Sequence, residues 1–440
     1  MKNRFPLLAA LSTLSLLISG CGNNGSSFKT DVKVKMDAGM NSEKTAYDLK
    51  MNYDDGYFTK DAKKYDKDLS LLSFASSLVS KNPNRGNEFF SKIEFNDVTA
   101  KNYTTDSTED DCAYIFAHKT IKKYELISIA IRGFDYQKEW ANNLKIGTSG
   151  NHEGFYKCAN DVYNELQTYV STYSGNKPLK LWINGYSRGG AISNVLSSVI
   201  IKDKKLDVSL ENMFVYTFES PRGLTKEDAV SYENVHNIVN TCDLIANIAP
   251  EKYELYRCGV DVEIYDSNVS RIVYDFDKGI TIPELTPTAN YSDDKQLVNY
   301  IINSIVNNSG ISEDRSANDR AHFANNYQNG LSYLVGLLFS MKDTTRTKMT
   351  NSLKSMGTGV LSMISDETGV QLATFMKTYL NSDSIVYNES NLTYSCSVLC
   401  KALNSVASPI ISIFTTANNN MTRLLDMHYP EVTYALLLNS

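Results

Sequence analysis

The sequence lacks an excess of basic charge, an internal repeat and a zinc-binding pattern of cysteines. Its 440 residues include 44 Lys and Arg against 50 Asp and Glu, a net charge of −6, so nothing in the composition indicates nucleic-acid binding. No segment recurs at a fixed period and no heptad run is present, so neither a solenoid nor a coiled coil is expected. The seven cysteines include no CxxC pair, so a zinc site is not expected either. What is present is 42% hydrophobic residues, a composition typical of a globular protein with a sizeable core.

Residues 1–20 have the pattern of a secretory signal. Lys2 and Arg4 precede an apolar stretch that ends at Ile18, and this stretch is too short for a membrane-spanning helix. The letters ISGC, which end at Cys21, resemble the bacterial lipobox, in which the cysteine is lipidated and becomes the first mature residue. The alternative is an ordinary signal peptide with a chance cysteine. We expect a protein that is exported and anchored by lipid on the outer face of the cytoplasmic membrane, in the bacterial cell envelope.

The other cysteines give no disulfide framework. Cys242 and Cys258 flank one loop and could form a bridge. Cys396 and Cys400 lie four residues apart, on one face of an expected helix, where they are interpreted as buried thiols. No pairing is predicted.

Strands and helices alternate in the first part of the chain. Apolar runs predict strands at 112–120, 124–133, 179–185, 212–220 and 235–240. Helical spacing of apolar residues predicts helices at 65–82, 154–173 and 188–202. This order is typical of a mostly parallel sheet with helical crossovers. After about residue 260 the pattern becomes mostly helical, at 295–307, 318–342, 348–380 and 396–416.

One serine lies between glycines where a predicted strand meets a predicted helix. Residues 185–189 read Gly-Tyr-Ser-Arg-Gly and fit the pattern G-x-S-x-G. In that pattern the serine occupies a sharp turn that would clash with side chains two positions away, and glycine relieves the clash. The following helix N-terminus favours developing negative charge. We interpret Ser187 as a nucleophile, against the alternative of an ordinary tight turn.

A nucleophilic serine needs a base, and the base needs an orienting acid. Asp243 directly follows a predicted strand, where the carboxyl edge of the sheet would present it, and Asp261 is the second candidate. Of the histidines that follow the serine, His236 lies inside a predicted strand and is expected in the core. His428 lies in a predicted loop near the C-terminus and is favoured as base over His322, which lies in the helical region.

Several segments together resemble the class 3 (fungal-type) lipase family, in its bacterial lipoprotein branch. They occur in the family's order and cover roughly 110–260 and 421–438: IAIRGFDYQKEWANNL (129–144), HEGFY (152–156), INGYSRGGAISNVL (183–196), VYTFESPRG (215–223), NIVNTCDLIANIAP (237–250) and HYPEVTYALL (428–437). In combination these matches are far more specific than the serine motif alone.

The resemblance implies Ser187 as nucleophile, Asp243 as acid and His428 as base. It also implies an oxyanion hole formed by the main-chain N–H groups of Phe134 and Arg188. The family often has Thr or Ser at the position of Phe134, and that hydroxyl can donate a hydrogen bond, whereas phenylalanine cannot. Because one lost donor can cost about a hundredfold in rate, activity is expected to be low or directed at activated esters.

Three further residues in these segments are given structural interpretations. Arg132 is expected to form a structural ion pair and not a substrate clamp. His152 is expected to order the start of a helix, and Trp140 is expected to contribute packing.

The expected architecture is an α/β-hydrolase fold with a mostly parallel central sheet. The expected divisions are a signal peptide at 1–20, a tether at 21–45, a hydrolase core with an N-terminal helical extension at 46–260, a helical insertion or cap at 261–420, and a C-terminal segment at 421–440 that returns the histidine to the core.

The expected activity is hydrolysis of carboxylic esters through an acyl-serine intermediate, with a lipid or other acyl ester as substrate and the membrane as partner through the lipid anchor. This chemistry requires no metal or organic cofactor. The alternatives are a phospholipase or thioesterase on the same triad, and a catalytically silent surface lipoprotein that binds an apolar ligand. The insertion is expected to form a cap that sets acyl-chain preference through Leu334, Leu337 and Phe339, against the alternative that these residues pack the insertion's own core.

Overall fold

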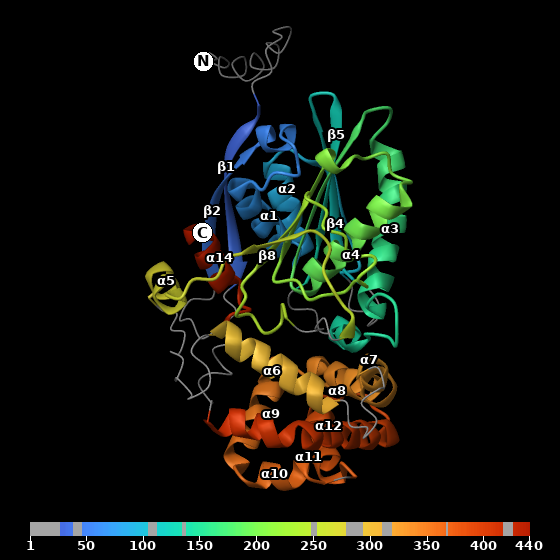
Figure 1. Cartoon of the computed structure of the whole chain (residues 1–440), viewed down its shortest axis with the longest axis vertical. Helices are drawn as coiled ribbons and strands as arrows, with labels where there is room; N and C mark the ends of the chain where they lie inside the picture. The colour runs from blue at the N-terminus through green and yellow to red at the C-terminus, as the bar shows by residue number, and fades with distance from the viewer. Residues whose placement is uncertain are drawn as a thin grey trace, which may run out of the picture.

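A seven-stranded sheet forms the centre of the upper body of the molecule (Figure 1). The computed structural model describes residues 27–37, 46–103, 112–133, 138–247, 253–278, 294–309, 319–366, 368–416 and 426–440. The strand order follows the sequence, from β3 to β9. The first three strands pair antiparallel, and each pairing from β5 onward is parallel. The strands are β3 (Asn96–Lys101), β4 (Tyr114–Ile121), β5 (Tyr124–Ile131), β6 (Leu179–Tyr186), β7 (Met213–Phe218), β8 (Val235–Val239) and β9 (Val260–Glu263).

Helices cover both faces of this sheet. One face carries α1 (Lys67–Val79), α2 (Pro83–Lys92), α5 (Val269–Phe276) and α14 (Pro430–Asn439), and the other carries α3 (Glu153–Tyr173) and α4 (Arg188–Asp203). Side chains alternate along a strand, so Trp182 and Tyr186 of β6 pack on the first face while Leu181 and Ile183 pack on the second. A mostly parallel sheet buried on both faces is the architecture of the α/β-hydrolase fold, as the strand and helix pattern predicts.

The prediction of a tether at residues 21–45 is wrong for residues 29–37. Residues Lys29–Asp37 form β1, which pairs antiparallel with β2 (Ala46–Asp54). Alternate residues of β1 are buried, among them Val32 and Val34, and they pack in the core cluster that also contains α1. The polar residues between them face solvent. Because only every second residue of β1 is apolar, its composition resembles that of a polar linker.

The boundary predicted at residue 261 also differs from the structure. β9 adds a parallel strand to the sheet, and α5 buries Val269 and Val273 in the core cluster. The helical layer therefore begins with α6, because the residues up to α5 find apolar partners in the core.

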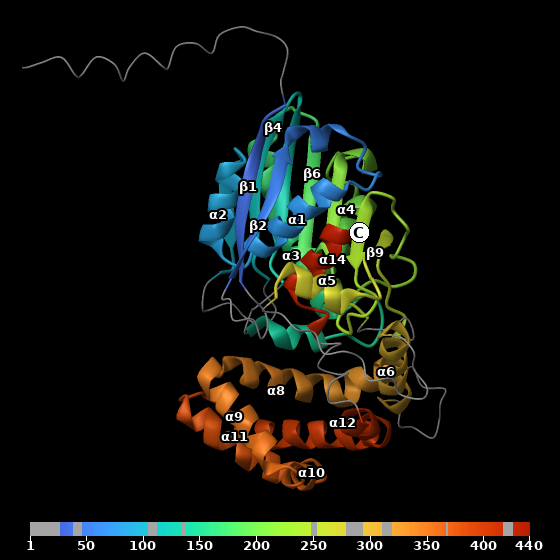
Figure 2. The same ribbon diagram turned by 90° about the vertical axis from the view of Figure 1, so that its left-hand side faces the viewer.

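The helical layer lies beyond the lower end of the sheet (Figures 1 and 2). It contains α6 (Asp294–Ser309), α7 (Asp319–Phe323), a π-helical turn (Ala324–Gln328), α8 (Asn329–Ser340), α9 (Asp343–Met356), α10 (Gly359–Ile364), α11 (Val370–Ser382) and α12 (Glu389–Thr416). Leu334 and Leu337 are buried in its own core, so those two side chains follow the alternative interpretation. Phe339 is partly buried, with the Arg346 guanidinium 5.1 Å from its ring centroid. Among the described residues, no helix is long and apolar enough to cross a membrane.

The layer is joined to the core by the loop between the 3-10 helix η2 (Lys138–Leu144) and α3. The guanidinium of Arg320 is buried and donates to the carbonyl oxygens of Gly147 at 3.0 Å and Gly150 at 2.7 Å, and also to those of Ile146, Ser149 and Asn151. The side chain of Gln328 accepts from the N–H of Gly147, and that of Ser332 donates to the carbonyl of Ala141. These contacts place α8 against η2.

The cysteines follow the prediction in part. Cys396 and Cys400 are buried thiols on α12. Cys242 and Cys258 lie in the clusters on opposite faces of the sheet and are not joined by a disulfide, so they do not form the bridge considered from the sequence.

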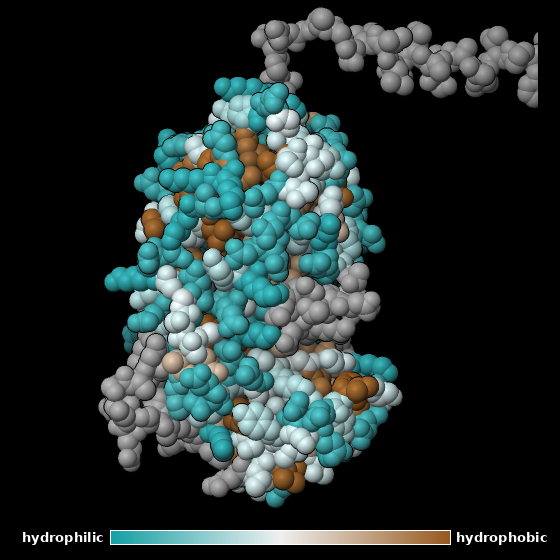
Figure 3. Space-filling model, turned by 90° about the vertical axis from the view of Figure 1, so that its right-hand side faces the viewer, coloured by the Kyte–Doolittle hydropathy of each residue, from teal (hydrophilic) through white to brown (hydrophobic). Residues whose placement is uncertain are grey.

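The face shown in Figure 3 is mainly hydrophilic, and its apolar residues form small separate patches on the core and on the helical layer. Such patches are normal on a soluble surface and need no partner to explain them.

Candidate active site

Ser187 occupies a strained turn between β6 and α4. Its φ is +56° and its ψ is −125°, outside the regions that L-residues ordinarily adopt. Its N–H donates to the carbonyl of Phe218 at 2.8 Å, which ties the turn to the end of β7. The side chain is 7% exposed. Strain of this kind at a turn is typical of a functional position.

The neighbouring glycines are required by close backbone contacts. A Cβ at Gly185 would lie 2.2 Å from the carbonyl oxygen of Gly189. A Cβ at Gly133, two residues after β5, would lie 1.7 Å from the carbonyl oxygen of Tyr186. The turn can therefore form only where these positions carry no side chain.

The structure brings together the three side chains selected from the sequence. His428 Nε2 is 2.8 Å from Ser187 Oγ, and His428 Nδ1 is 2.5 Å from Asp243 Oδ2. Asp243 is fully buried, and the side chain of His428 is 15% exposed. With Nδ1 donating to the carboxylate, the neutral imidazole leaves Nε2 as an acceptor for the serine hydroxyl.

Main-chain groups hold the carboxylate of Asp243. Its Oδ1 accepts from the N–H of Ile245 at 2.7 Å, and its own N–H donates to the carbonyl of Asn240 at 2.9 Å. The side chain of Asn247 donates to the carbonyl of Asp243 at 2.8 Å. This short turn after β8 fixes the carboxylate toward His428.

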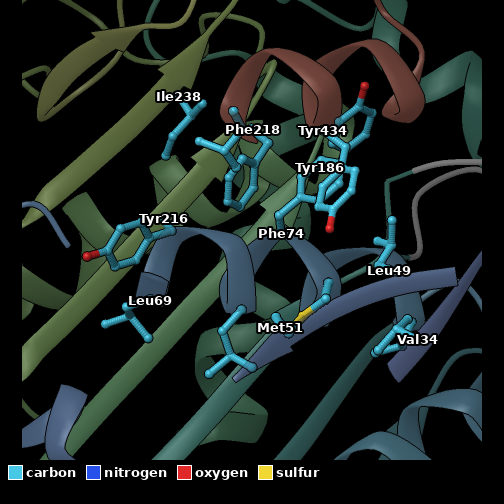
Figure 4. Close-up of a cluster of buried hydrophobic side chains, with 14 of the residues drawn as sticks. Val34, Leu49, Met51, Leu69, Phe74, Tyr186, Tyr216, Phe218, Ile238 and Tyr434 are labelled. Carbon is cyan, nitrogen blue, oxygen red and sulfur yellow. The ribbon is translucent and has the colours of Figure 1, made fainter. Parts of the chain in front are cut away.

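The segment that carries His428 is held by α14 and by Tyr186, the residue before Ser187. The hydroxyl of Tyr186 donates to the carbonyl of His428 at 2.5 Å. Tyr434 on α14 stacks on Phe74 of α1, with ring centroids 5.9 Å apart, and Phe74 also contacts Tyr186 and Phe218 (Figure 4). An aromatic cluster thus couples the C-terminal helix to the strands that end at the site.

Arg188 begins α4 directly after the serine, so its N–H lies in the first helical turn, where such groups lack intrahelical partners. Its buried guanidinium reaches Glu139 of η2 at 3.8 Å and Asn142 Oδ1 at 3.3 Å. Arg132 pairs with Glu139 at 3.1 Å, which confirms the structural ion pair expected from the sequence. Phe134 and Cys21 lie outside the described residues, and so does the side chain of Trp140.

The other acidic and basic candidates lie elsewhere. Asp261 pairs with Arg257 at 2.7 Å; burial opposes its ionisation, but the guanidinium outweighs that effect and lowers the pKa of Asp261. His322 lies on α7 with its Nδ1 3.2 Å from the side-chain nitrogen of Asn326. His236 is buried in β8, as predicted, and donates to the carbonyl of Ala62.

His152 orders the start of α3, as the sequence analysis expects. Its Nδ1 accepts from the N–H of Phe155 at 3.3 Å, and its Nε2 donates to the carbonyl of Asn143 at 3.1 Å. Burial lowers the pKa of His152 to about 3, so the ring is neutral at physiological pH.

Two residues at the site were not identified from the sequence. Tyr186 has only its position inside the serine motif as a signal, and Glu219 has only its position inside the segment VYTFESPRG, to which no role was assigned. Both are fully buried beside the three selected side chains.

Comparisons with known proteins find one family match and several similar structures. Residues 128–253 match the family model described as lipase (class 3). None of the curated proteins matches the sequence. The triacylglyceride lipase of Rhizomucor miehei is similar in structure at 20% identity, over 47% of this chain and 83% of that chain, with a TM-score of 0.37. Lipase II from Rhizopus niveus is similar at 17% identity, over 48% of this chain and 81% of that chain, with a TM-score of 0.33. The lipase from Rhizopus microsporus var. chinensis is similar at 16% identity, over 48% of this chain and 75% of that chain, with a TM-score of 0.32.

The family match spans β5 to the turn after β8, and so includes Ser187 and Asp243 but not His428. Residues 128–253 thus carry the class 3 lipase pattern, which indicates that the protein is a carboxylic ester hydrolase.

Proposed function

We propose that the protein hydrolyses acyl esters of lipids through an acyl-serine intermediate on Ser187, with His428 as general base and Asp243 as the acid that orients it. The observation that carries the proposal is the continuous chain of two hydrogen bonds, of 2.8 and 2.5 Å, that joins the three side chains. Serine is a weak nucleophile until a base accepts its proton, and this chain provides the base in the required geometry.

In the proposed mechanism Ser187 Oγ attacks the ester carbonyl while His428 Nε2 takes the hydroxyl proton. The imidazolium that forms is stabilised by the buried carboxylate of Asp243. The negative oxygen of the tetrahedral intermediate is stabilised at the start of α4 by the N–H of Arg188 and the positive end of the helix dipole. His428 then protonates the departing alcohol, and water releases the acyl group by the same steps in reverse order.

An active-site-directed fluorophosphonate tests the nucleophile and the base. We expect it to label Ser187, because only an activated serine attacks such a phosphorus centre at a useful rate. Ser187→Ala and His428→Ala should each lower kcat/KM for a 4-nitrophenyl ester by roughly a thousandfold or more.

His322→Ala is the matched control, because His322 is outside the hydrogen-bonded chain and its loss should leave labelling unchanged. Labelling at another serine, or normal labelling of His428→Ala, would contradict the assignment. A panel of 4-nitrophenyl esters from acetate to palmitate, with a phospholipid and a thioester beside it, identifies the acyl class.

A further inference from the structure

Glu219 is a buried carboxyl group at the site that the proposed mechanism does not use. It follows β7 directly, is fully buried and has a φ of +47°. Its N–H donates to the carbonyl of Ile238 on β8 at 3.0 Å, and the preceding carbonyl, of Phe218, accepts from Ser187. Glu219 is thereby fixed both to the turn that carries the serine and to the strand that leads to Asp243.

Two unfavourable features coincide at this residue. A left-handed backbone strains any residue with a Cβ, whereas glycine adopts it freely. A carboxyl group removed from water also requires hydrogen-bond partners to offset its desolvation. A residue that combines both features needs a compensating role, and its side-chain contacts indicate which one.

The carboxyl group of Glu219 is hydrogen-bonded both to the turn that carries Asp243 and to α14, the helix that follows His428. It accepts from the N–H of Asn240 at 3.0 Å and from the hydroxyl of Thr433 at 3.1 Å. Asn240 opens the turn that presents Asp243, through the hydrogen bond from the N–H of Asp243 to its carbonyl. Thr433 lies on α14, five residues after His428.

A tyrosine contacts this network next to the segment that carries the base. The hydroxyl of Thr433 is 3.3 Å from that of Tyr186, which donates to the carbonyl of His428 at 2.5 Å. Glu219 is therefore linked by hydrogen bonds to the segments that carry the serine, the acid and the histidine.

The carboxyl groups of Glu219 and Asp243 are both fully buried and interact directly, and they cannot both be ionised at low energetic cost. Burial, and then the charge of Asp243, raise the pKa of Glu219 well above its usual range. The other titratable groups around it are Tyr186 at the end of β6, with Glu431 close to that hydroxyl, and His428. Asp243 is the group hydrogen-bonded to the histidine, so the proton of the pair is assigned to Glu219.

We propose that Glu219 is a positioning residue of the triad: as a neutral carboxylic acid it donates a hydrogen bond to Asp243 and so fixes the carboxylate that orients His428. The O–H of Glu219 adds to the donors from His428 and Ile245, while its two oxygens continue to accept from Asn240 and Thr433. This inference rests on the proposed function, because it assigns Glu219 a role only through Asp243.

Glu219→Gln and Glu219→Met separate this role from packing. The amide of Gln donates to Asp243 and accepts from Asn240 and Thr433, so kcat should stay near that of the wild type. Met fills similar space without hydrogen bonds, so kcat should fall by about tenfold to a hundredfold, with KM little changed. A residue that only packs would give two variants that differ in melting temperature but have the same kcat per folded molecule.

The pH profile of kcat/KM is the second readout and depends only on the Gln variant. If Glu219 is neutral in the wild type, Gln leaves the charge beside His428 unchanged, and the acid limb should keep its midpoint. A midpoint lowered by about one pH unit would mean that Glu219 is ionised, and would overturn the inference even if the Met variant does not fold.

Ser187→Ala, measured in parallel, distinguishes a failure of the proposed function from a failure of the role assigned to Glu219. Hydrolysis that survives Ser187→Ala overturns the proposed function and this inference with it. Hydrolysis that is lost in Ser187→Ala but kept at the wild-type rate in Glu219→Met overturns the inference alone.

Discussion

Ser187 and Glu219 end neighbouring strands of the sheet, and both have positive φ angles, 56° and 47°. A left-handed conformation costs a residue with a Cβ about 1–2 kcal/mol. The two residues lie in the same network, since the N–H of Ser187 is bonded to the carbonyl that precedes Glu219. Two of the non-glycine residues with positive φ in this chain are thus residues on which the proposed chemistry depends.

His152 shows a different effect at the residue scale, since its side chain is buried without a charge. The pKa is about 3 in the folded protein and about 6.5 in the unfolded chain. Above pH 6.5 the ring is neutral in both states, and its contribution to stability is complete. As the pH falls below 6.5 the unfolded chain binds a proton that the folded protein excludes until about pH 3, so stability is lost across that window.

We therefore expect His152→Asn to make the protein less sensitive to acid. Asn can accept the N–H of Phe155 as a helix cap, so the helix start is preserved. Between pH 6.5 and 5 the wild type should lose about 2 kcal/mol more of its free energy of unfolding than the variant, at roughly 1.4 kcal/mol per pH unit. Urea unfolding at both pH values measures this difference, and equal losses in the two proteins would contradict the buried neutral ring.

At the scale of elements, one loop connects the site to the helical layer. Residues 138–151, which include η2, carry Glu139 beside Arg188 and end at the start of α3. The same loop receives Arg320, Gln328 and Ser332 from the layer. A displacement of α8 would therefore act directly on the segment that adjoins the serine turn.

Arg320 is the strongest of these connections, because a single guanidinium donates to several carbonyls of the loop. We expect Arg320→Lys to lower the free energy of unfolding by on the order of 2 kcal/mol, since an ammonium group cannot reproduce the planar set of five donors. The matched control is Arg271→Lys on α5, where the side chain is 82% exposed.

Hydrogen exchange locates this effect. Faster exchange at residues 146–151 in Arg320→Lys, with unchanged exchange in α1, is the expected result. If the two lysine variants unfold at the same urea concentration, the guanidinium does not hold the loop.

At the scale of the whole molecule, the hydrogen bonds of the proposed triad join residues that are far apart in the sequence. Asp243 and His428 are 185 residues apart, and the helical layer is formed by residues between them. The chain returns to the core at α14, where Tyr434 packs on Phe74 of α1 (Figure 4). Tyr434 also packs on Phe276 of α5, and α14 so restores the histidine to the site.

The membrane anchor is a proposal at this scale too. Cys21→Ala should abolish lipid attachment, because the thiol is the acceptor in the lipobox pattern. The wild type should then partition with membranes and the variant should not, as measured by fractionation and by mass spectrometry of the N-terminal peptide. Wild-type protein recovered without a lipid-modified cysteine would refute this proposal.

The sequence by itself determined the order of strands and helices, the serine turn and the choice of Asp243 and His428. These depend on local patterns: apolar periodicity, glycines at fixed spacing, and a carboxylate directly after a strand. Only the tertiary structure decided that residues 29–37 form a strand, because burying one face of that strand depends on α1, which lies far along the chain. It also decided the place of Glu219, whose partners Asn240 and Thr433 are 21 and 214 residues away, a separation that no local pattern records.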